Sequence, residues 1–383
     1  MLWLVCFCNY ADRLALSAVL LPLKQEFGLS DYQLGWLSSS FLVIYALAVP
    51  ITGFVADRWN RKAIILTGLV GWSLLTYLTA LGRSFEQLFA ARAFTGLGEA
   101  FYFPAAMSLL SDYYGPETRS RALSVHQTSV YAGTIGGASL AGYIAQFYGW
   151  RAAFMVFGGA GIVIAVLLAA LVREPKRQAG DQRLEARGKT DLRLPEVLLL
   201  FAAFVAANFV AMGVLSWLPV FVHQRFGAGL GASGAIATVG LQSASFAGVL
   251  IGGVLADSLH RRHAAGRAIT MGIGLVLGAP FLVLCGLAPA LPWFIAGSIG
   301  FGLAKGIYDS NIFAGLFDYV PASARATASG LMIAVGYFLG SAAPILMGRL
   351  SPQFGLGPVL AGFALVYAGG AILIAMVVWR ARA

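Results

Sequence analysis

Apolar stretches of about 20 residues follow one another along almost the whole chain, separated by short polar turns. A helix needs roughly 20 apolar residues to cross a bilayer, so this pattern predicts twelve membrane-spanning helices. They are expected at residues 2–24, 34–56, 63–82, 86–110, 122–147, 152–172, 196–222, 233–256, 268–288, 292–316, 326–349 and 356–379. One long polar stretch, REPKRQAGDQRLEARGKTDLRLPE, separates the sixth span from the seventh. The pattern therefore predicts an all-α membrane protein, with a six-helix bundle at 1–172, a cytoplasmic linker at 173–195 and a second six-helix bundle at 196–383.

Composition supports this interpretation and excludes a water-soluble domain. Hydrophobic residues make up 59% of the 383 residues and charged residues only 11%, against about 25% charged in soluble domains. The net charge of +10 would suggest nucleic-acid binding in a soluble protein. Here the basic residues gather in the loops after spans two, four, six, eight and ten, which is typical of cytoplasmic loops. We therefore expect no nucleic-acid partner, both termini in the cytoplasm, and a bacterial inner membrane as the location.

The two halves of the chain repeat each other. GFVADRWNRK (53–62) and GVLADSLHRR (253–262) align with an offset of 200 residues. Further along, seven residues of the first half match identical residues 206 positions later, among them Gly96 with Gly302 and Tyr102 with Tyr308. The sequence therefore predicts a tandem duplication with pseudo-two-fold symmetry, an arrangement typical of transporters that rock two bundles around a central cavity. Small-residue faces for close helix packing are expected at glycines 133, 136, 137 and 142 and at glycines 330, 336, 340 and 348.

These motifs resemble the major facilitator superfamily, through G-x-x-A-D-R-x-x-R-K after span two and R-x-x-x-G-x-G-E-A (92–100) in span four. NYADR in span one, together with Arg92 and Glu99, resembles two of its branches. One branch is the anion:cation symporters of sugar acids and other organic anions. The other is the Spinster-like transporters, whose animal members move lysophospholipids and sphingolipids, and YDSNIF (308–313) is more similar to their bacterial members.

Six ionisable groups fall at membrane depth: Asp12, Arg13, Arg92, Glu99, Lys305 and Asp309. Each costs roughly 2.5–3.5 kcal/mol at a helix centre, so six unpaired groups would cost on the order of 15–20 kcal/mol. That exceeds the whole stability of a typical domain, about 5–15 kcal/mol. The groups therefore pair or line a hydrated cavity. They either hold helices together or form a functional site, and the second interpretation is favoured because buried ion pairs seldom stabilise more than apolar residues.

Charge chemistry suggests a role for each group. Glu99, among apolar neighbours, is expected to exchange a proton near neutral pH. Arg13, adjacent to Asp12, is expected to hold that carboxylate ionised until span one moves. The guanidinium groups of Arg13 and Arg92 offer forked donors suited to a carboxylate or phosphate. In the symporters that this sequence resembles, acids at the positions of Asp12 and Glu99 couple protons, and the two arginines bind substrate.

Other polar residues complete the predicted site. Lys305 and Asp309, four residues apart, share a helix face and could pair locally. Side chains expected to contribute to substrate binding are Tyr45, Tyr102, Lys305, Tyr308, Asp309 and Asn311. Tyr45, Tyr308 and Asn311 could equally form interhelical hydrogen bonds, and Tyr102 could form part of an apolar wall or pack in the helix core. His126, five residues after Arg121, is expected to be an interfacial anchor rather than a proton relay.

The turn after span two carries an acid and several bases, which could lock adjacent helix ends together and release them during transport. The residues expected to form this gate and its counterpart in the second half are Asp57, Arg58, Arg61, Lys62, Asp257 and Arg261. The resemblance to the superfamily implies the same role. Positive charge that only sets membrane topology would explain the bases, but not the repeated aspartate.

The sequence therefore predicts a secondary transporter, working by alternating access as a proton-coupled symporter of a small organic anion. A Spinster-like carrier of a lysophospholipid or sphingolipid-type amphipath is the alternative, and a membrane sensor that binds ligand without transport is an alternative of another class. An enzyme is not expected, because the sequence has no nucleophile–base pair, metal-spaced His/Cys set or phosphate-binding loop. We expect no catalytic residue, no metal, no cofactor beyond the proton gradient as energy source, and a monomer that contacts the lipid bilayer.

Overall fold

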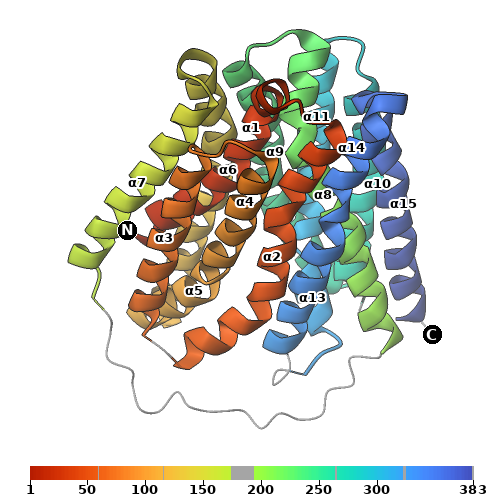
Figure 1. Cartoon of the computed structure of the whole chain (residues 1–383). Helices are drawn as coiled ribbons and strands as arrows, with labels where there is room; N and C mark the ends of the chain where they lie inside the picture. Colours follow the sequence, from red (N-terminus) through yellow and green to blue (C-terminus); the bar gives the residue numbers. More distant parts are fainter. Residues whose placement is uncertain (59, 115, 174–193, 264, 322–324, 382–383) are drawn as a thin grey trace. The chain divides into compact units, whose positions relative to one another are not determined.

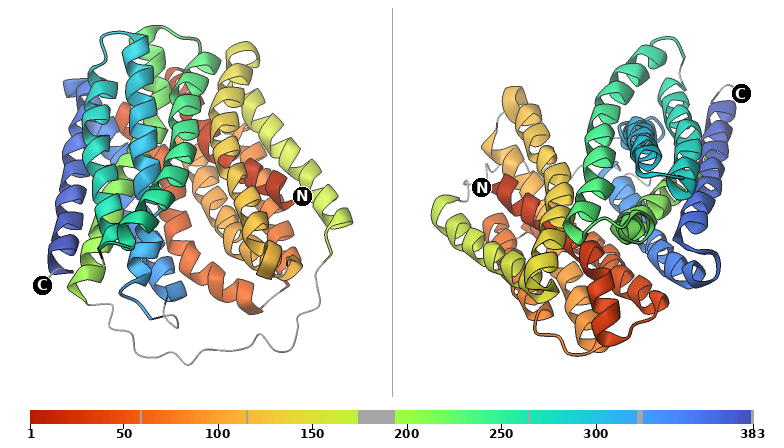
Figure 2. Two further views of the ribbon diagram at one scale, coloured as in Figure 1. Left: turned by 180° about the vertical axis from the view of Figure 1, so that it is seen from behind. Right: turned by 90° about the horizontal axis from the view of Figure 1, so that it is seen from above.

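The computed structural model describes residues 1–58, 60–114, 116–173, 194–263, 265–321 and 325–381. The described residues form helices and no strand (Figure 1, Figure 2). The helices are α1 (Leu2–Phe27), α2 (Asp31–Arg58), α3 (Arg61–Thr79), α4 (Phe85–Ala100), α5 (Tyr102–Tyr113), α6 (Pro116–Tyr148), α7 (Trp150–Leu171), α8 (Pro195–Phe226), α9 (Leu230–His260), α10 (Gly266–Leu287), α11 (Leu291–Asp309), α12 (Ile312–Phe317), α13 (Arg325–Gly340), α14 (Ala342–Phe354) and α15 (Leu356–Arg380).

The helices correspond to the twelve predicted spans once three interruptions are recognised. Span four consists of α4 and α5, span ten of α11 and α12, and span eleven of α13 and α14. In the described part of the chain, nine helical stretches are long and apolar enough to cross a membrane on their own. The remaining spans are α4–α5, α6 and α11–α12. The predicted all-α membrane fold is confirmed.

The interruption in span four has a local cause. Pro104 lies one turn after the junction at Phe101, and a proline has no backbone N–H and clashes with the carbonyl four residues earlier, here that of Ala100. In span ten an asparagine ends the helix instead. The Asn311 side-chain amide donates to the Gly252 carbonyl of α9 at 3.1 Å and to the Ser310 hydroxyl at 2.7 Å. Both interruptions follow closely on charged residues that the sequence assigns to the site.

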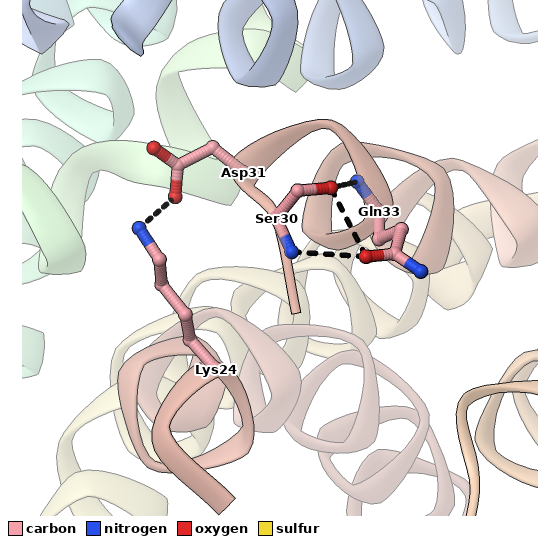
Figure 3. A network of polar contacts seen from close by, with 4 residues as sticks. All are labelled: Lys24, Ser30, Asp31 and Gln33. Carbon is pink, nitrogen blue, oxygen red and sulfur yellow. Dashed lines mark hydrogen bonds and ion pairs between the residues drawn. The ribbon is translucent and has the colours of Figure 1, made fainter. Parts of the chain in front are cut away.

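A capping box begins α2 (Figure 3). The Ser30 hydroxyl accepts from the Gln33 backbone N–H at 3.2 Å, and the Gln33 side-chain oxygen accepts from the Ser30 backbone N–H at 2.9 Å. Lys24, near the end of α1, pairs with Asp31 at 2.6 Å. Gly28 ends α1 in the left-handed conformation with φ 63°, which glycine adopts without steric cost. These contacts fix the tight turn between the first two spans.

Replacing Ser30 with alanine tests this cap. Alanine leaves the Gln33 N–H without its side-chain acceptor, and we expect a loss of about 1 kcal/mol of stability, whereas glycine costs only a few tenths. Thermal unfolding of the purified protein measures both variants. Equal melting temperatures for wild type and Ser30→Ala would show that the cap contributes nothing.

The duplication is visible in how the helices approach each other. An added Cβ at Gly96 of α4 would lie 2.5 Å from the Phe41 carbonyl oxygen of α2, and one at Gly302 of α11 would lie 2.2 Å from the Leu241 carbonyl oxygen of α9. The two glycines are 206 residues apart and the two carbonyls 200. The offset of 206 also relates two further close approaches, Gly68 to the Gly98 carbonyl and Gly274 to the Ala304 carbonyl. The repeat predicted from sequence therefore governs helix packing in both halves.

Glycines of α6 bring α1 into direct backbone contact. An added Cβ at Gly133 would lie 2.5 Å from the Phe7 carbonyl oxygen, and one at Gly137 would lie 2.3 Å from that of Ala11. The small-residue face predicted there is confirmed, and it fixes the segment of α1 that carries the first membrane charges. Gly330 was also predicted to lie on a small-residue face, but it approaches no other helix closely, because an added Cβ would meet no described atom within 4 Å.

The helices form two compact units. Unit 1 comprises Met1–Ala179, Leu215–Thr238 and Pro344–Arg349, and unit 2 comprises Gly180–Val214, Val239–Ala343 and Leu350–Ala383. These units do not coincide with the halves at 1–172 and 196–383, and that division of the chain stays a prediction.

Candidate functional site

Arg13 of α1 and Glu99 of α4 form a buried ion pair. The Arg13 Nε donates to the Glu99 Oε2 at 2.7 Å, and the Glu99 side chain is completely buried. Adjacent residues point about 100° apart around a helix, so the Asp12 carboxylate faces another neighbour. Its Oδ2 accepts from the Thr76 hydroxyl of α3 at 3.4 Å. The prediction that Arg13 pairs with Asp12 is therefore wrong, because the packing of α1 directs the two side chains to different helices.

Aromatic rings surround the Arg13 guanidinium. Its central carbon lies 4.4 Å from the ring centre of Tyr45, 4.7 Å from that of Tyr10 and 5.1 Å from that of Phe41. Such contacts attract a cation through the ring quadrupole. The three rings thus help to hold the guanidinium in place beside its carboxylate partner.

Arg92 lies on the same face of α4 as Glu99, as the seven-residue spacing predicts. It is 1% exposed, and its Nη1 donates to the main-chain carbonyl of Asp12 at 3.4 Å. Its guanidinium also lies 5.4 Å from the Phe41 ring. Asp12, Arg13, Arg92 and Glu99 therefore form one cluster within unit 1, which we call the charge cluster.

The charge cluster leaves hydrogen-bonding capacity unused. Among the described residues, no partner is found for the Asp12 Oδ1, the Arg92 Nε or the Glu99 Oε1, although all three atoms are buried. Buried polar atoms are nearly always paired, so each exception needs an explanation. A polar ligand that offers donors to the two carboxylate oxygens and an acceptor to the Arg92 Nε would supply the missing partners.

Tyr102 lies in the core of unit 1. Its hydroxyl hydrogen-bonds to the Leu2 carbonyl at 2.7 Å and to the His126 Nε2 at 2.8 Å, and its ring packs edge-on against Trp72. His126 is only 2% exposed. The prediction of an interfacial anchor at His126 is therefore wrong, because the start of α1 and Tyr102 cover the ring.

The predicted residues of the second half form a separate group in unit 2. Lys305 and Asp309 form an ion pair one helical turn apart, as their spacing predicts. Asn311 holds the break in span ten, and Tyr308 is 1% exposed in the core of unit 2. That these four residues bind substrate stays a prediction, and the same holds for Tyr45 and Tyr102.

The predicted gate is described only in part. The side chains of Asp57 and Arg58 lie outside the described residues. The Arg61 Nη1 donates to the Ser108 hydroxyl at 3.0 Å, and the Lys62 Nζ donates to the Ala169 carbonyl in the last turn of α7 at 2.8 Å. A cation is favourable at a helix C-terminus. Lys62 therefore ties the start of α3 to the end of α7.

The second half has an ion pair close to the equivalent turn, between two residues that were not predicted for the gate. Asp257 and Arg261 are exposed, whereas Arg267, at the start of α10, pairs with Asp318. Arg267 follows Arg61 by 206 residues, the offset of the later repeat, so a strict use of that offset would have found it. A gating role for all of these residues stays a prediction.

In the part of the chain that the structure describes, twelve helical spans, a duplicated packing pattern and a buried cluster of opposite charges are typical of membrane transporters. The family model described as Major Facilitator Superfamily matches residues 2–265, and the chain belongs to this superfamily.

Similar proteins support this assignment. Protein spinster homolog 1 of Homo sapiens is 30% identical over 375 residues, which cover 90% of this chain and 71% of that protein. Protein spinster of Drosophila melanogaster is 28% identical, with 91% of this chain and 61% of that protein covered. Probable anion transporter 4, chloroplastic, of Oryza sativa subsp. japonica is 30% identical, with 73% of this chain and 52% of that protein covered. The chain thus spans about half to three quarters of the length of these relatives.

A solved structure shares the fold. A bacterial homolog of the human lysosomal transporter Spinster, crystallised in an inward-facing and occupied conformation, superposes with a TM-score of 0.86 at 22% sequence identity. The match covers 98% of this chain and 95% of that chain. The major facilitator fold predicted from sequence is therefore confirmed.

Proposed function

We propose that this protein is a proton-coupled symporter that carries a small organic anion by alternating access around a central cavity. The observation that carries the proposal is the buried Arg13–Glu99 ion pair, with Asp12 and Arg92 beside it. The pair joins a group that can exchange a proton to a cation suited to binding an anion.

The coupling mechanism follows from keeping the net charge of the buried cluster constant. When Glu99 takes up a proton, its attraction for Arg13 weakens, and the guanidinium becomes available to a substrate carboxylate. A carboxylate also fits the unused donor of Arg92. One proton and one monoanion together leave the net charge of the cluster unchanged, which matters because uncompensated charge is costly in a buried site. Binding of proton and anion is therefore cooperative.

The aromatic rings around Arg13 supply the apolar part of the site. Tyr45 and Phe41 contact the guanidinium and stack on each other, and we expect their edges to meet the hydrocarbon portion of an organic acid. The same rings and arginines also suit a lysophospholipid or sphingolipid-type amphipath with an anionic headgroup. The resemblance of the sequence motifs to the Spinster-like branch, whose animal members move such lipids, favours this alternative substrate. The relative named as a probable anion transporter favours the organic anion.

The proposal also includes the second half of the chain, the energy source and the membrane in which the protein lies. Lys305, Tyr308, Asp309 and Asn311 contribute substrate contacts from the second half, and the proton gradient is the energy source, without a cofactor. The protein acts as a monomer in a bacterial inner membrane. Both termini lie in the cytoplasm, an orientation that the distribution of basic residues supports. A sensor that binds ligand without transport would share the charge cluster but would not accumulate substrate.

A thermal-shift screen tests the substrate class. Purified protein is heated with a panel of small organic acids and a panel of lysolipids, at two pH values. We expect stabilisation by organic acids alone, lost in Arg92→Ala, because a ligand that binds the folded state raises its stability by RT ln(1 + [L]/Kd). Stabilisation by lysolipids alone would establish the alternative substrate.

Uptake into proteoliposomes then separates transporter from sensor. The stabilising acid should accumulate inside vesicles when a pH gradient is imposed, and a protonophore should abolish the accumulation. Accumulation that survives the protonophore would contradict proton coupling, and binding without any uptake would indicate a sensor.

A further inference from the structure

Asp12 differs from Glu99 in the partners of its carboxyl group. Glu99 forms an ion pair with Arg13. Within the described part of the chain, the one hydrogen bond to the Asp12 side chain comes from the Thr76 hydroxyl of α3 at 3.4 Å, and the Asp12 Oδ1 has no partner. Asp12 is nonetheless only 1% exposed. The charge state of so sparsely paired a carboxyl group depends strongly on the donors that reach it.

α3 offers a second donor to the same carboxyl group. Trp72 lies one helical turn before Thr76, and residues four apart share a helix face. Its side chain interacts with the Asp12 carboxyl group, but its Nε1 is buried without a hydrogen-bond partner among the described residues, as is the Asp12 Oδ1. An indole N–H can only donate and a carboxylate can only accept. The two unpaired atoms are therefore complementary, and a small rotation of the carboxyl group would join them.

Helix packing holds Trp72 in this position. An added Cβ at Gly98 of α4 would lie 3.2 Å from the Trp72 Cβ and 3.3 Å from its main-chain nitrogen. The indole ring packs edge-on against the Tyr102 ring, with the ring centres 6.0 Å apart. Contacts with α4 and α5 thus fix the indole, and they do not involve α1.

The second half of the chain lacks both donors. The offset of 206 residues, which relates the glycine contacts of α3 to those of α10, places Gly278 at the position of Trp72 and Leu282 at the position of Thr76. Neither side chain can donate a hydrogen bond. The difference between the halves therefore concerns hydrogen bonding at two positions of one helix face.

Packing alone does not explain this difference. The space beside Gly278 is occupied by the Tyr367 ring of α15, because an added Cβ at Gly278 would lie 2.5 Å from the Tyr367 Cε1. An aromatic ring is thus common to both halves. α8, the counterpart of α1, carries its one acid, Glu196, in its first turn. The two donors therefore occur only in the half that carries a buried acid on its first helix.

We propose that Trp72 and Thr76 are positioning residues that hold the Asp12 carboxylate and set the pH at which it exchanges a proton. Both donors stabilise the ionised carboxylate more than the neutral acid, since charge-assisted hydrogen bonds are about twice as strong as neutral ones. The charge cluster has no net charge only while Asp12 is ionised. α3 therefore determines the pH range in which the cluster can take up one proton with one monoanion. The inference rests on the proposed function, in which the cluster couples a proton to an anion.

The other charged groups around Asp12 lie on α4 and on α1 itself. Arg92 and Glu99 act on its carboxyl group from α4, and the neighbouring Arg13 is directed at Glu99. α7, which also packs against α1, carries its one charged residue in its first turn. All of these groups are unchanged in the variants below. The uncharged titratable side chains in this part of unit 1 are Cys6, Cys8 and Tyr10 of α1, Tyr45 of α2, Tyr102 of α5 and His126 of α6.

Infrared titration of the purified full chain measures Asp12 directly. The C=O stretch of its protonated carboxyl group is assigned by its absence in Asp12→Asn. We expect Thr76→Val and Trp72→Phe each to move the midpoint of this titration to higher pH by about one unit, a tenfold change in proton affinity. Thr76→Ser keeps the hydroxyl and should titrate like the wild type.

Thr79→Val is the matched control. Thr79 lies on the same helix and is buried as well, but its hydroxyl donates to the Leu75 carbonyl of its own helix at 2.8 Å. The midpoint should stay unchanged in this variant, and thermal unfolding checks that every variant is folded. An unchanged midpoint in Thr76→Val or Trp72→Phe would overturn the role of that residue. A shift as large in Thr79→Val, or the absence of any Asp12 titration, would overturn the whole proposal.

The pH profile of uptake into proteoliposomes is the second readout. Uptake should decline on the acidic side as Asp12 becomes protonated, and the pH of this decline should rise by about one unit in Thr76→Val, in step with the infrared midpoint. A decline at the wild-type pH in a variant whose infrared midpoint has moved would overturn the control of transport by α3. A wild-type protein without proton-driven uptake would contradict the proposed symport alone, because the infrared titration does not require transport.

Discussion

Glu99→Gln is expected to abolish uphill accumulation of substrate while leaving exchange of substrate across the membrane intact. Glutamine is isosteric with glutamate and can still accept the hydrogen bond from the Arg13 Nε, which lies 2.7 Å from the Glu99 Oε2, but it cannot take up or release a proton. Coupling to one proton lets the wild type concentrate a monoanion about tenfold for each pH unit of gradient, since 1.4 kcal/mol corresponds to a factor of ten. In the variant the ratio of inside to outside concentrations should stay near one. Uptake and counterflow of labelled substrate in proteoliposomes measure the two activities separately.

Asp309→Asn is the matched control for this prediction. Asp309 is also an acid paired with a base, Lys305, but it belongs to unit 2. We expect this variant to bind substrate more weakly and still to accumulate it. If Glu99→Gln concentrates substrate as well as wild type, the coupling site lies elsewhere, and Asp12 is the next carboxylate to replace.

Gly137→Ala is expected to destabilise the protein and to impair transport. The added Cβ would lie 2.3 Å from the main-chain carbonyl oxygen of Ala11 and 2.6 Å from its Cα. These are backbone atoms, so α1 and α6 must move apart. Overpacking of this kind costs about 1–3 kcal/mol, and the shift falls on the segment of α1 that carries Asp12 and Arg13. Thermal unfolding and uptake measure both effects.

Gly159→Ala, on the neighbouring α7, is expected to have the opposite effect on stability. An added Cβ at Gly159 meets no described atom within 4 Å, so alanine gains helix propensity of up to about 1 kcal/mol without a clash. The two substitutions should therefore shift the melting temperature in opposite directions. A stabilising effect of Gly137→Ala would show that the contact between α1 and α6 is looser than described.

Hydrophobic runs predicted the spans because the apolar length needed to cross a bilayer is fixed, and the bilayer leaves few alternatives to a helix. α1, observed at Leu2–Phe27, was predicted at 2–24, and α15, observed at Leu356–Arg380, was predicted at 356–379. The prediction was less accurate for the start of α6, which was expected at residue 122 and is observed at Pro116. The extra turns are polar and carry no hydropathy signal, although a proline is common in the first turn of a helix.

The interruptions within spans were harder to anticipate. Pro104 gives a local reason for the break in α4–α5, but the break after Asp309 depends on Asn311 reaching the Gly252 carbonyl of another helix. A contact between residues 59 positions apart is not encoded in local propensity. Such breaks are tolerated in a membrane because neighbouring groups satisfy the freed backbone.

The sequence by itself determined which charges lie in the membrane, how many helices carry them, and that the chain is duplicated, because these features follow from composition, length and repeat. Only the tertiary structure decided which charges meet. Asp12 and Arg13 are adjacent in sequence, yet Arg13 pairs with Glu99 and Asp12 faces α3. His126 likewise depends on Tyr102 and the start of α1 for its burial. The physical reason is the same in both cases: neighbours on a helix diverge by about 100°, so their partners depend on the rotation and approach of helices distant in sequence.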